Sequence, residues 1–318
     1  MKEFLIGKND AGQRVDKFIT KSLDLPSSLL YKSIRLKKIK VNRKRTEPSA
    51  ILLEGDTVQC FLADEFFKGD KDTAVFGRIK PKLNIVYEDE NIILLDKKPG
   101  VSVHEDEHSA SNTLITHVLA YLYQKGEYRP DEENSFAPAL CNRIDRNTGG
   151  IVIAAKNAEA LRVMNEKIKL REIDKFYLAA VHGIPKRSED TLTAYLLKDE
   201  KTKTVKIYEK NPPRAAKKII TKYRVISAKG NNALCEVELL TGRTHQIRAH
   251  MARIGHPLIG DGKYGTNNSD RKQGYKYQAL YSYKLKFSFK DSENALSYLN
   301  GREFSIDTDD IYFVNDFS

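Results

Sequence analysis

The densest cluster of chemically capable residues lies at positions 142–150, with the sequence NRIDRNTGG. Asp145 stands there between Arg143 and Arg146, just before the apolar run IVIAA. A carboxylate on a turn that enters a buried strand is suited to act as a nucleophile or to stabilise positive charge on a substrate. The same pattern is equally typical of a salt-bridged turn in which Asp145 only bonds the local backbone. This segment alone therefore leaves a catalytic and a structural role open.

A second cluster spans residues 240–251, with the sequence LTGRTHQIRAHM. Its apolar residues recur at helical spacing, which predicts a helix that Thr244 caps and that ends near Gly255. The basic and imidazole side chains near its start are those of Arg243, His245 and Arg248. A helix N-terminus also offers free backbone N–H groups, so this one is suited to bind a phosphate or a buried carboxylate.

Apolar runs predict the strands that must carry these two clusters. We expect strands over 151–155, 176–181, 219–226 and 234–240, after a hairpin over 83–97, with helices near 114–122 and 158–168. Few of these strands alternate regularly with helices, as a parallel architecture would require. The expected fold class is therefore α+β, with a large, mainly antiparallel sheet flanked by helices. Phe176 and Tyr177 must point to opposite faces of their strand, so one of them belongs to the core.

Residues 1–62 predict a separate small domain. Two short helices, over 11–24 and 27–36, precede a small hairpin in which KIKVN reads as the first strand. Residues 63–82 mix charges, glycine and proline without periodicity, which is typical of a linker that packs only in part. The remaining residues, 83–318, are then a second and larger domain, which carries both polar clusters.

The distribution of charge points to a polyanionic partner. The 318 residues carry a formal net charge of +11, of which +6 lies in residues 1–62 and −6 in residues 291–318. Residues 32–45 alone hold eight basic side chains and no acid. A basic surface held by a folded core is typical of phosphate binding, although a merely solvated face is the alternative. The candidate nucleic-acid-binding residues of this basic run are Lys37, Lys38, Lys40, Arg43, Lys44 and Arg45. Arg143, Arg243 and His245 of the two clusters above are further candidates for the same role.

The composition also excludes several classes of protein. A hydrophobic share of 40% argues against disorder, and no window approaches the roughly 18 apolar residues that a membrane helix needs. Three cysteines without paired spacing argue against disulfides and structural zinc, so we expect a soluble protein of the cytoplasm. His104 and His108 are four residues apart but lack a third ligand, so no metal site is expected.

Taken together, the motifs resemble those of the RluA type of RNA pseudouridine synthase. The resemblance is carried by NRIDRNTGG, DKFYLAAVHG and LLTGRTHQIRAHMARIGHPLIGDGKYG, which occur in the family's order within residues 85–290. Residues 1–62 resemble the small RNA-binding domain of the ribosomal protein S-four type, or alpha-L motif, which many members carry. The resemblance implies an isomerase that converts uridine to pseudouridine in RNA, with large-subunit (23S) ribosomal RNA as the expected substrate.

The resemblance also implies roles for single residues. The family's catalytic aspartate falls on Asp145, its companion tyrosine on Tyr177 and its HQIR arginine on Arg248. Arg143 would fill the space left by the extruded nucleotide. The reaction breaks a glycosidic N–C bond and reforms it at ring carbon five, which needs an ionised carboxylate as nucleophile or charge stabiliser. A guanidinium keeps such a carboxylate ionised, and a tyrosine can stack on uracil and move a proton.

No cofactor or metal is expected, because an isomerisation retains every atom of its substrate. The expected partner is RNA, bound by a monomer without involvement of a membrane. Two alternatives stay open: a transfer RNA substrate, and a non-catalytic RNA-binding or ribosome-assembly protein on the same fold. Two positions depart from the family's commonest pattern, Asn142 where histidine is usual and Gly149 where serine is usual. Neither is the acid, so these departures concern supporting hydrogen bonds.

Overall fold

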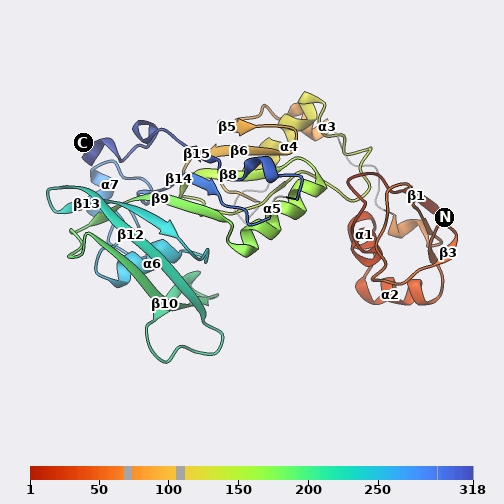
Figure 1. Cartoon of the computed structure of the whole chain (residues 1–318), viewed down its shortest axis with the longest axis horizontal. Helices are drawn as coiled ribbons and strands as arrows, with labels where there is room; N and C mark the ends of the chain where they lie inside the picture. The colour runs from red at the N-terminus through yellow and green to blue at the C-terminus, as the bar shows by residue number, and fades with distance from the viewer. Residues whose placement is uncertain (68–73, 105–111, 292, 318) are drawn as a thin grey trace.

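The computed structural model describes residues 1–67, 74–104, 112–291 and 293–317. A small N-terminal unit and a large sheet domain lie next to each other along the longest axis of the molecule (Figure 1). Within the described ranges, no helix is both long enough and apolar enough to cross a membrane.

The N-terminal unit consists of a four-stranded antiparallel sheet and two helices. Its strands, in pairing order, are β1 (Lys2–Leu5), β4 (Thr57–Cys60), β2 (Ile39–Val41) and β3 (Lys44–Arg45), and its helices are α1 (Val15–Ser22) and α2 (Ser27–Arg35). Helices and sheet share one core, in which Phe18, Ile39 and Val58 are fully buried. Strand β1 was not expected from the sequence, since it is short and half charged. It forms because β4 offers it an antiparallel edge.

In the described part of the chain, eleven strands form the large sheet. Nine of them pair in the order β11-β10-β12-β13-β9-β14-β8-β6-β5, with β15 beside β14 and β7 beside β8. Their bounds are β5 (Ile85–Glu88), β6 (Ile92–Lys97), β7 (Ala139–Leu140), β8 (Gly149–Ala155), β9 (Ile173–His182), β10 (Glu189–Asp199), β11 (Thr204–Tyr208), β12 (Lys217–Lys229), β13 (Asn232–Leu239), β14 (Leu280–Phe287) and β15 (Glu303–Ser305). Every named pair is antiparallel except β14 with β8, so the α+β prediction is confirmed.

Helices cover both faces of the sheet around β6 and β8. The helices of this domain are α3 (Ala74–Arg78), α4 (Leu114–Lys125), α5 (Ala158–Leu170), α6 (Gln246–Arg253) and α7 (Asn268–Lys272). Alternate residues of β6 serve opposite layers: Leu95 packs in one core with Val118 of α4, and Leu94 packs in another with Met164 of α5. All seven residues of β8 are buried, so the strand that follows the Asp145 loop is fixed from both sides.

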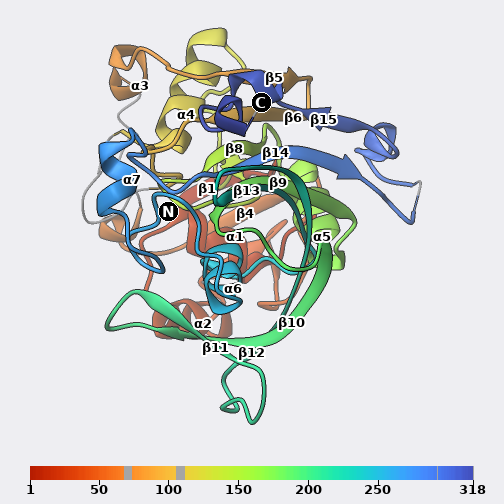
Figure 2. The same ribbon diagram turned by 90° about the vertical axis from the view of Figure 1, so that its left-hand side faces the viewer.

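The other half of the sheet carries α6. Ile247 and Met251 of this helix share a core with Tyr177 of β9 and Val237 of β13. In Figure 2, α6 lies within the curve of the sheet, while the turns of the β10–β12 hairpins project beyond it. This packing brings the N-terminus of α6 next to β9, and thus brings the two clusters predicted from the sequence to one region.

The acidic C-terminal segment completes the large domain instead of trailing from it. Ile311 and Phe313 are fully buried in the core that also contains Met164. Between them, the hydroxyl of Tyr312 donates a hydrogen bond to the carbonyl of Gln278 (3.0 Å). Residues 303–317 therefore support the chain just before β14.

Direct hydrogen bonds join the N-terminal unit to the sheet domain. The Asp10 carboxylate, 2% exposed, accepts hydrogen bonds from the Asn134 amide (2.7 Å) and the Ser135 hydroxyl (2.6 Å). The Arg162 guanidinium of α5 donates to the carbonyl of Ala11 (3.1 Å). The N-terminal unit is therefore docked on the sheet domain and not joined to it by the chain alone.

Both described ends of the expected linker, residues 63–82, pack on neighbouring elements. Phe66 and Phe67 lie against the core of the N-terminal unit. Farther along, Phe76 of α3 packs against the core that contains α4. The segment between these ends, residues 68–73, lies outside the described residues.

Candidate active site

Side-chain hydrogen bonds tie the loop that carries Asp145 to strand β8. The loop connects β7 to β8. The Asn142 carbonyl oxygen accepts a hydrogen bond from the backbone N–H of Ile153 (2.7 Å), and its amide nitrogen donates to the carbonyl of Ile151 (3.4 Å). An amide has both a donor and an acceptor, so Asn142 pairs with β8 much as a strand residue would. The departure from histidine thus leaves this loop firmly held.

Close packing accounts for the second departure, at Gly149. A Cβ atom at this position would lie 2.2 Å from the ring of Tyr281. Tyr281 is 1% exposed, and its hydroxyl donates a hydrogen bond to the Asp96 carboxylate (2.6 Å). Tyr281 therefore fills the space that a serine side chain would need, and glycine is the residue that fits beside it.

A buried lysine holds the other side of the loop. Lys97 ends β6, is 1% exposed, and donates hydrogen bonds from Nζ to the carbonyls of Lys98 (3.2 Å), Val101 (2.9 Å) and Arg146 (2.9 Å). Because Arg146 directly follows Asp145, Lys97 fixes the backbone next to the carboxylate. Burial lowers the pKa of Lys97 to about 7, although nearby carboxylates, Asp145 foremost, oppose this lowering.

Replacing Lys97 by methionine is expected to reduce the pH dependence of stability between about pH 7 and 10. The folded chain holds the Lys97 pKa below its ordinary value of about 10.4, so the unfolded chain binds more protons in this window. The contribution of Lys97 to the free energy of unfolding therefore rises with pH there.

Between pH 7 and 9, the free energy of unfolding of the wild type should rise by about 2 kcal/mol relative to that of Lys97→Met, as measured by urea unfolding. The control is Lys169→Met, a change at an exposed lysine. The free energy of unfolding of the wild type should not rise with pH relative to that of this control. A difference between wild type and Lys97→Met that stays constant with pH would contradict this account.

Helix α6 begins at Gln246, and the prediction that Thr244 caps it is wrong. The N-cap position is His245, whose φ of +53° lies in the left-handed region. The Gln246 side chain instead orders this turn, since its carbonyl oxygen accepts a hydrogen bond from the backbone N–H of Arg243 (3.1 Å). Its amide nitrogen also donates to the carbonyl of Ile220 in β12 (3.0 Å). A contact with a distant strand has therefore displaced the local cap.

Two carboxylates and one guanidinium form the centre of the site. Arg248 donates from Nη1 to Asp145 Oδ2 (2.8 Å), and from Nε and Nη2 to the two oxygens of Asp261 (2.7 and 2.9 Å). The Asp261 side chain has no exposed surface, whereas that of Asp145 is 25% exposed. Asp261 therefore holds the guanidinium from the protein side, and the guanidinium presents its remaining nitrogen to Asp145.

The pKa values of this pair follow from burial and charge. Burial by itself raises the pKa of the Asp261 carboxyl, but hydrogen bonds and charge from Arg248 outweigh burial and leave the pKa below its usual value. Burial likewise lowers the pKa of Arg248, and the two carboxylates more than offset this, so that the net shift is upward. Both groups are therefore charged at neutral pH.

A cavity of about 1050 Å³ opens above Asp145, between the sheet and the start of α6. Tyr177 and Lys175 of β9 line it, since both point to the same face of that strand. Tyr177 is 6% exposed, and burial raises the pKa of its hydroxyl to about 12. The volume is at the upper end of the range of roughly 300–1,000 Å³ typical of small-molecule sites, so a nucleotide has room here.

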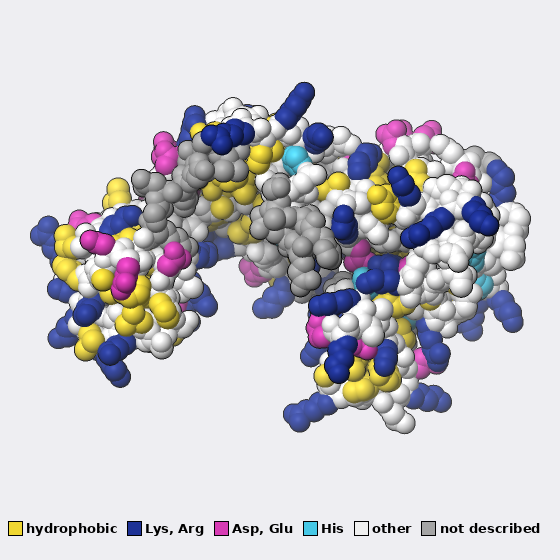
Figure 3. Space-filling model, turned by 180° about the vertical axis from the view of Figure 1, so that it is seen from behind, with side chains coloured by type: hydrophobic (Ala, Val, Ile, Leu, Met, Phe, Trp, Pro, Cys, Tyr) yellow, Lys and Arg dark blue, Asp and Glu magenta, His cyan; other side chains and the backbone are white. Residues whose placement is uncertain are grey.

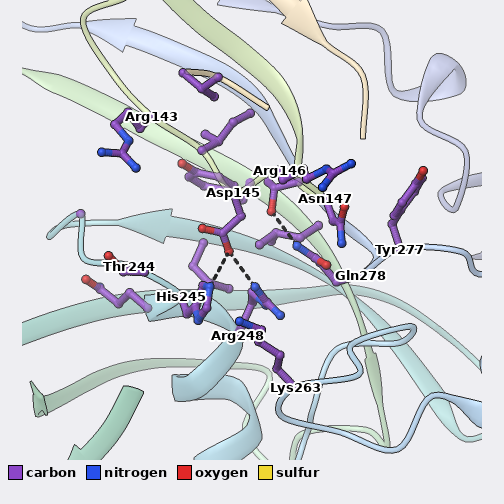
Figure 4. A pocket seen from close by; sticks show the side chains of 18 of the residues that line it. Arg143, Asp145, Arg146, Asn147, Thr244, His245, Arg248, Lys263, Tyr277 and Gln278 are labelled. Carbon is purple, nitrogen blue, oxygen red and sulfur yellow. Dashed lines mark hydrogen bonds and ion pairs between the residues drawn. The ribbon is translucent and has the colours of Figure 1, made fainter. Parts of the chain in front are cut away.

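Two of the basic residues predicted to bind RNA lie at the rim of this cavity. Arg143 and Arg243 are exposed and line its opening, and in Figure 4 Arg143 points away from Asp145. His245 and Arg248 instead point at the carboxylate from below, and His245 Nε2 lies 3.7 Å from Asp145 Oδ2. The structure thus brings Asp145, Tyr177, Arg248 and His245 around one space, with the two exposed arginines at its opening.

The basic run lies on the N-terminal unit and not at the cavity. Five of its predicted RNA-binding side chains are exposed, and the sixth, Lys40, is half-buried with its ammonium over the ring of Phe61 (5.4 Å). Figure 3 shows further lysine and arginine side chains around the hollow above the lobe of β10 and β11. Basic surface is therefore present both on the N-terminal unit and around the cavity.

Three residues of the site were not singled out from the sequence. Asp261 lies in a Gly-Asp-Gly stretch that reads as a simple turn, and Lys97 lies in a strand exit rich in lysine. Tyr264 contacts both partners of Asp145: its hydroxyl lies 2.8 Å from His245 Nδ1, and the Arg248 guanidinium lies 5.3 Å from its ring centre. None of the three is distinctive by residue type. Only their positions inside or beside the family motifs could have pointed to them.

The described side chains offer neither a metal site nor a disulfide. Across the ranges that the structure describes, no three His, Cys, Asp or Glu residues are grouped so that they could hold a metal ion. His108 lies outside those ranges. The three cysteines are free thiols.

Comparisons with known proteins identify the family of this chain. Residues 91–253 match the family model described as RNA pseudouridylate synthase. An uncharacterized RNA pseudouridine synthase of Mycoplasma genitalium is 36% identical, over 90% of this chain and 88% of the relative. The ribosomal large subunit pseudouridine synthase C of Vibrio vulnificus is 30% identical, over 92% and 90%. Among solved structures, human RNA pseudouridylate synthase domain containing 4 shares the fold, with a TM-score of 0.54, 22% identity, and coverage of 70% of this chain and 87% of that one.

Proposed function

Because this chain belongs to the RNA pseudouridylate synthase family, we propose that it isomerises uridines of large-subunit ribosomal RNA, with Asp145 as its catalytic carboxylate. The family match establishes an isomerase that acts on RNA. The ribosomal substrate is supported by relatives whose names state it, at about 30% identity over most of both chains. In this proposal, the protein acts as a monomer in the cytoplasm.

One observation carries the proposal: Asp145 is the carboxylate that faces the cavity while a buried guanidinium holds one of its oxygens. Arg248 contacts only Oδ2, and no hydrogen bond to Oδ1 is seen among the described residues. An ionised carboxylate with one restrained and one open oxygen can approach a sugar carbon without first losing a proton. Asp261, by contrast, is enclosed, and both of its oxygens are used by Arg248.

The reaction then needs little beyond this carboxylate and a closed pocket. The bond between N1 of uracil and C1′ of the sugar breaks, the ring turns, and C5 bonds to C1′. One proton leaves C5 and one is gained at N1, so the atoms balance without a co-reactant. Asp145 acts either by bonding to C1′ or by stabilising the positive charge there.

In this proposal, Tyr177 stacks on the uracil and donates a hydrogen bond or a proton. Its hydroxyl stays protonated at neutral pH because burial raises its pKa to about 12. It therefore cannot serve as a phenolate base, but it remains available as an acid. Phe176, the preceding residue, lies half-buried on the opposite face under Lys284, whose Nζ is 4.4 Å from the ring centre.

Residues 1–62 would hold RNA while residues 83–318 perform the chemistry, with 63–82 as the connection. Swinging a uridine out of an RNA helix costs a few kcal/mol, which backbone contacts elsewhere must offset. The exposed basic run can supply such contacts from the N-terminal unit, and Arg143 and Arg243 can supply them at the rim.

Replacing Lys37, Lys38 and Lys44 together by glutamine is expected to weaken RNA binding and to flatten its salt dependence. Each lost phosphate contact should reduce the slope of log affinity against log salt by about 0.7–0.9. The matched control replaces Lys169, Lys186 and Lys229, which are equally exposed but belong to neither basic surface, by glutamine. Equal slopes for the two triple variants would show that the basic run is only a solvated face.

The decisive test of substrate and activity is a map of pseudouridines in cells with and without the gene. Loss of specific sites from large-subunit ribosomal RNA is the expected result. Loss from transfer RNA alone would move the assignment to the other substrate class. Unchanged maps of both RNAs would favour a non-catalytic RNA-binding protein.

A further inference from the structure

We propose that Tyr264 fixes His245 as the neutral imidazole protonated on Nε2, and that this N–H is a second support for the Asp145 carboxylate. His245 and Tyr264 are thereby positioning residues, which act on the reaction through Asp145. The inference rests on the proposed function only in its consequence for turnover, because the state of the imidazole is a property of the free protein.

The hydrogen bonds of the Tyr264 hydroxyl decide which nitrogen of His245 carries the proton. The backbone N–H of Val205 donates to this hydroxyl (2.9 Å), and His245 Nδ1 lies 2.8 Å from it. A hydroxyl has one proton to donate, and Val205 occupies one of its lone pairs. Among the described residues these are the two hydrogen bonds of the hydroxyl, so donation to Nδ1 is the arrangement that uses its single proton, and Nδ1 is then unprotonated. A neutral imidazole with an unprotonated Nδ1 carries its proton on Nε2.

The protonated nitrogen faces the proposed catalytic carboxylate. His245 Nε2 lies 3.7 Å from Asp145 Oδ2, the same oxygen that receives Arg248 Nη1 at 2.8 Å (Figure 4). Both supports therefore lie on Oδ2, which leaves Oδ1 toward the cavity. A small rotation of the carboxylate, as a substrate enters, would bring Oδ2 within hydrogen-bonding distance of Nε2.

Local geometry shows that the imidazole is held in this place. His245 adopts a left-handed φ of +53°, which a residue with a side chain seldom adopts unless its surroundings impose it. Its ring packs edge-on against the Tyr264 ring, with centres 5.6 Å apart, and the Arg248 guanidinium lies over the same tyrosine. Burial also lowers the pKa of His245, which favours the neutral form.

Hydrogen bonds also connect Tyr264 and its neighbour Lys263 to the hairpin of β10 and β11. Val205 belongs to β11, and the side chain of Lys263, next to Tyr264, donates to the carbonyl of Lys203 in the same hairpin (3.0 Å). The hairpin is thus fastened at two points to the turn that carries Asp261 and Tyr264. Tyr264 therefore keeps its orientation only while β11 stays in place.

The state of His245 can be read directly from nitrogen chemical shifts of the full-length protein with ¹⁵N-labelled histidine at pH 7. We expect one signal set with the pattern of a neutral, Nε2-protonated ring, assigned by its loss in His245→Gln. In Tyr264→Phe the donor to Nδ1 is gone, so the pattern should move toward a mixture of forms. A wild-type ring that is protonated on Nδ1, or on both nitrogens, overturns the proposal. This measurement needs no RNA, so it stands even if the proposed function fails.

Single-turnover rates on an RNA substrate test the consequence. Glutamine can place an N–H near the position of Nε2, whereas leucine fills similar space without a donor. We expect His245→Gln to stay within about fivefold of wild type, His245→Leu to fall about 100-fold and Tyr264→Phe about tenfold, with RNA affinity within about twofold. The control is Tyr298→Phe, whose hydroxyl bonds Asp89 away from the cavity. Equal rates for the glutamine and leucine variants would overturn the role of the N–H, and a wild type inactive on every RNA would overturn the proposed function instead.

Discussion

Asp145→Asn is expected to reduce pseudouridine formation by at least about 10³-fold while leaving RNA affinity within about threefold, which is under 1 kcal/mol. The amide has the same shape and can still accept the Arg248 hydrogen bond through its oxygen. It can neither bond to a sugar carbon as a nucleophile nor carry the charge that balances a cationic sugar. Shape and binding should therefore survive, and chemistry should not.

The measurement is tritium release or direct pseudouridine detection on purified RNA, beside a binding titration of the same preparation. Asp131→Asn, the same change at an exposed position away from the cavity, is the control and should turn over at the wild-type rate. If Asp145→Asn retained measurable turnover, the assignment of the carboxylate would be wrong. If it lost RNA affinity by much more than threefold, Asp145 would be a binding residue instead.

The largest loss of stability is expected from Asp261→Ala, at about 3–5 kcal/mol. The Asp261 side chain has no exposed surface and binds Arg248 through both oxygens, so its removal leaves a buried guanidinium without its main partner. Activity should fall as well, because the guanidinium is then free to turn away from Asp145. Urea unfolding and single-turnover rates measure the two effects separately.

A double variant distinguishes the buried charge from the lost contact. Replacing Arg248 by methionine and Asp261 by leucine removes both charges at once, and should unfold at higher urea than Asp261→Ala. It should remain inactive, since Asp145 has lost its guanidinium. A double variant as unstable as the single one would show that the unpaired charge is not the cause.

The ion pair of Asp261 and Arg248 also makes the stability of the fold depend on pH in acid. The folded-state pKa of Asp261 is lower than its usual value, so its contribution is present above about pH 4 and is lost as the pH falls through the folded pKa. The difference in stability between wild type and Asp261→Ala should therefore shrink in strongly acidic buffer.

The fold class and several of the strands could be predicted because their signals are local, whereas β10 and β14 were not expected from the sequence. A buried strand such as β8 is a continuous apolar run, and α5 shows its apolar stripe in the sequence. Strand β1 could not be predicted, because its partner β4 lies more than fifty residues away and supplies what its own residues lack. The start of α6 was predicted wrongly for the same reason. Gln246 forms a hydrogen bond with β12, and this contact replaces the cap expected from Thr244.

Within the site, the sequence could point to segments but not to the partners that hold them. Asp145 and Arg248 stood out since each lies in a dense polar cluster beside an apolar element. Asp261 and Lys97 did not, because their importance comes from burial, and burial depends on which distant chain covers a side chain. The family resemblance covered Asp261 as part of a motif, but it gave no reason for a carboxylate there. The bidentate contact with Arg248 supplies that reason.

The C-terminal support of the cavity wall has a consequence for the order in which the protein can mature on the ribosome. Residues 303–317 follow all the catalytic segments in the chain, yet Ile311 and Phe313 fill the main core and Tyr312 fastens the carbonyl of Gln278, a residue of the cavity. The N-terminal unit has a core of its own and can fold as soon as it has emerged. If the N-terminal unit binds RNA as proposed, a nascent chain can hold RNA before it can modify it, because the cavity takes its final shape only after residues 303–317 have been synthesised.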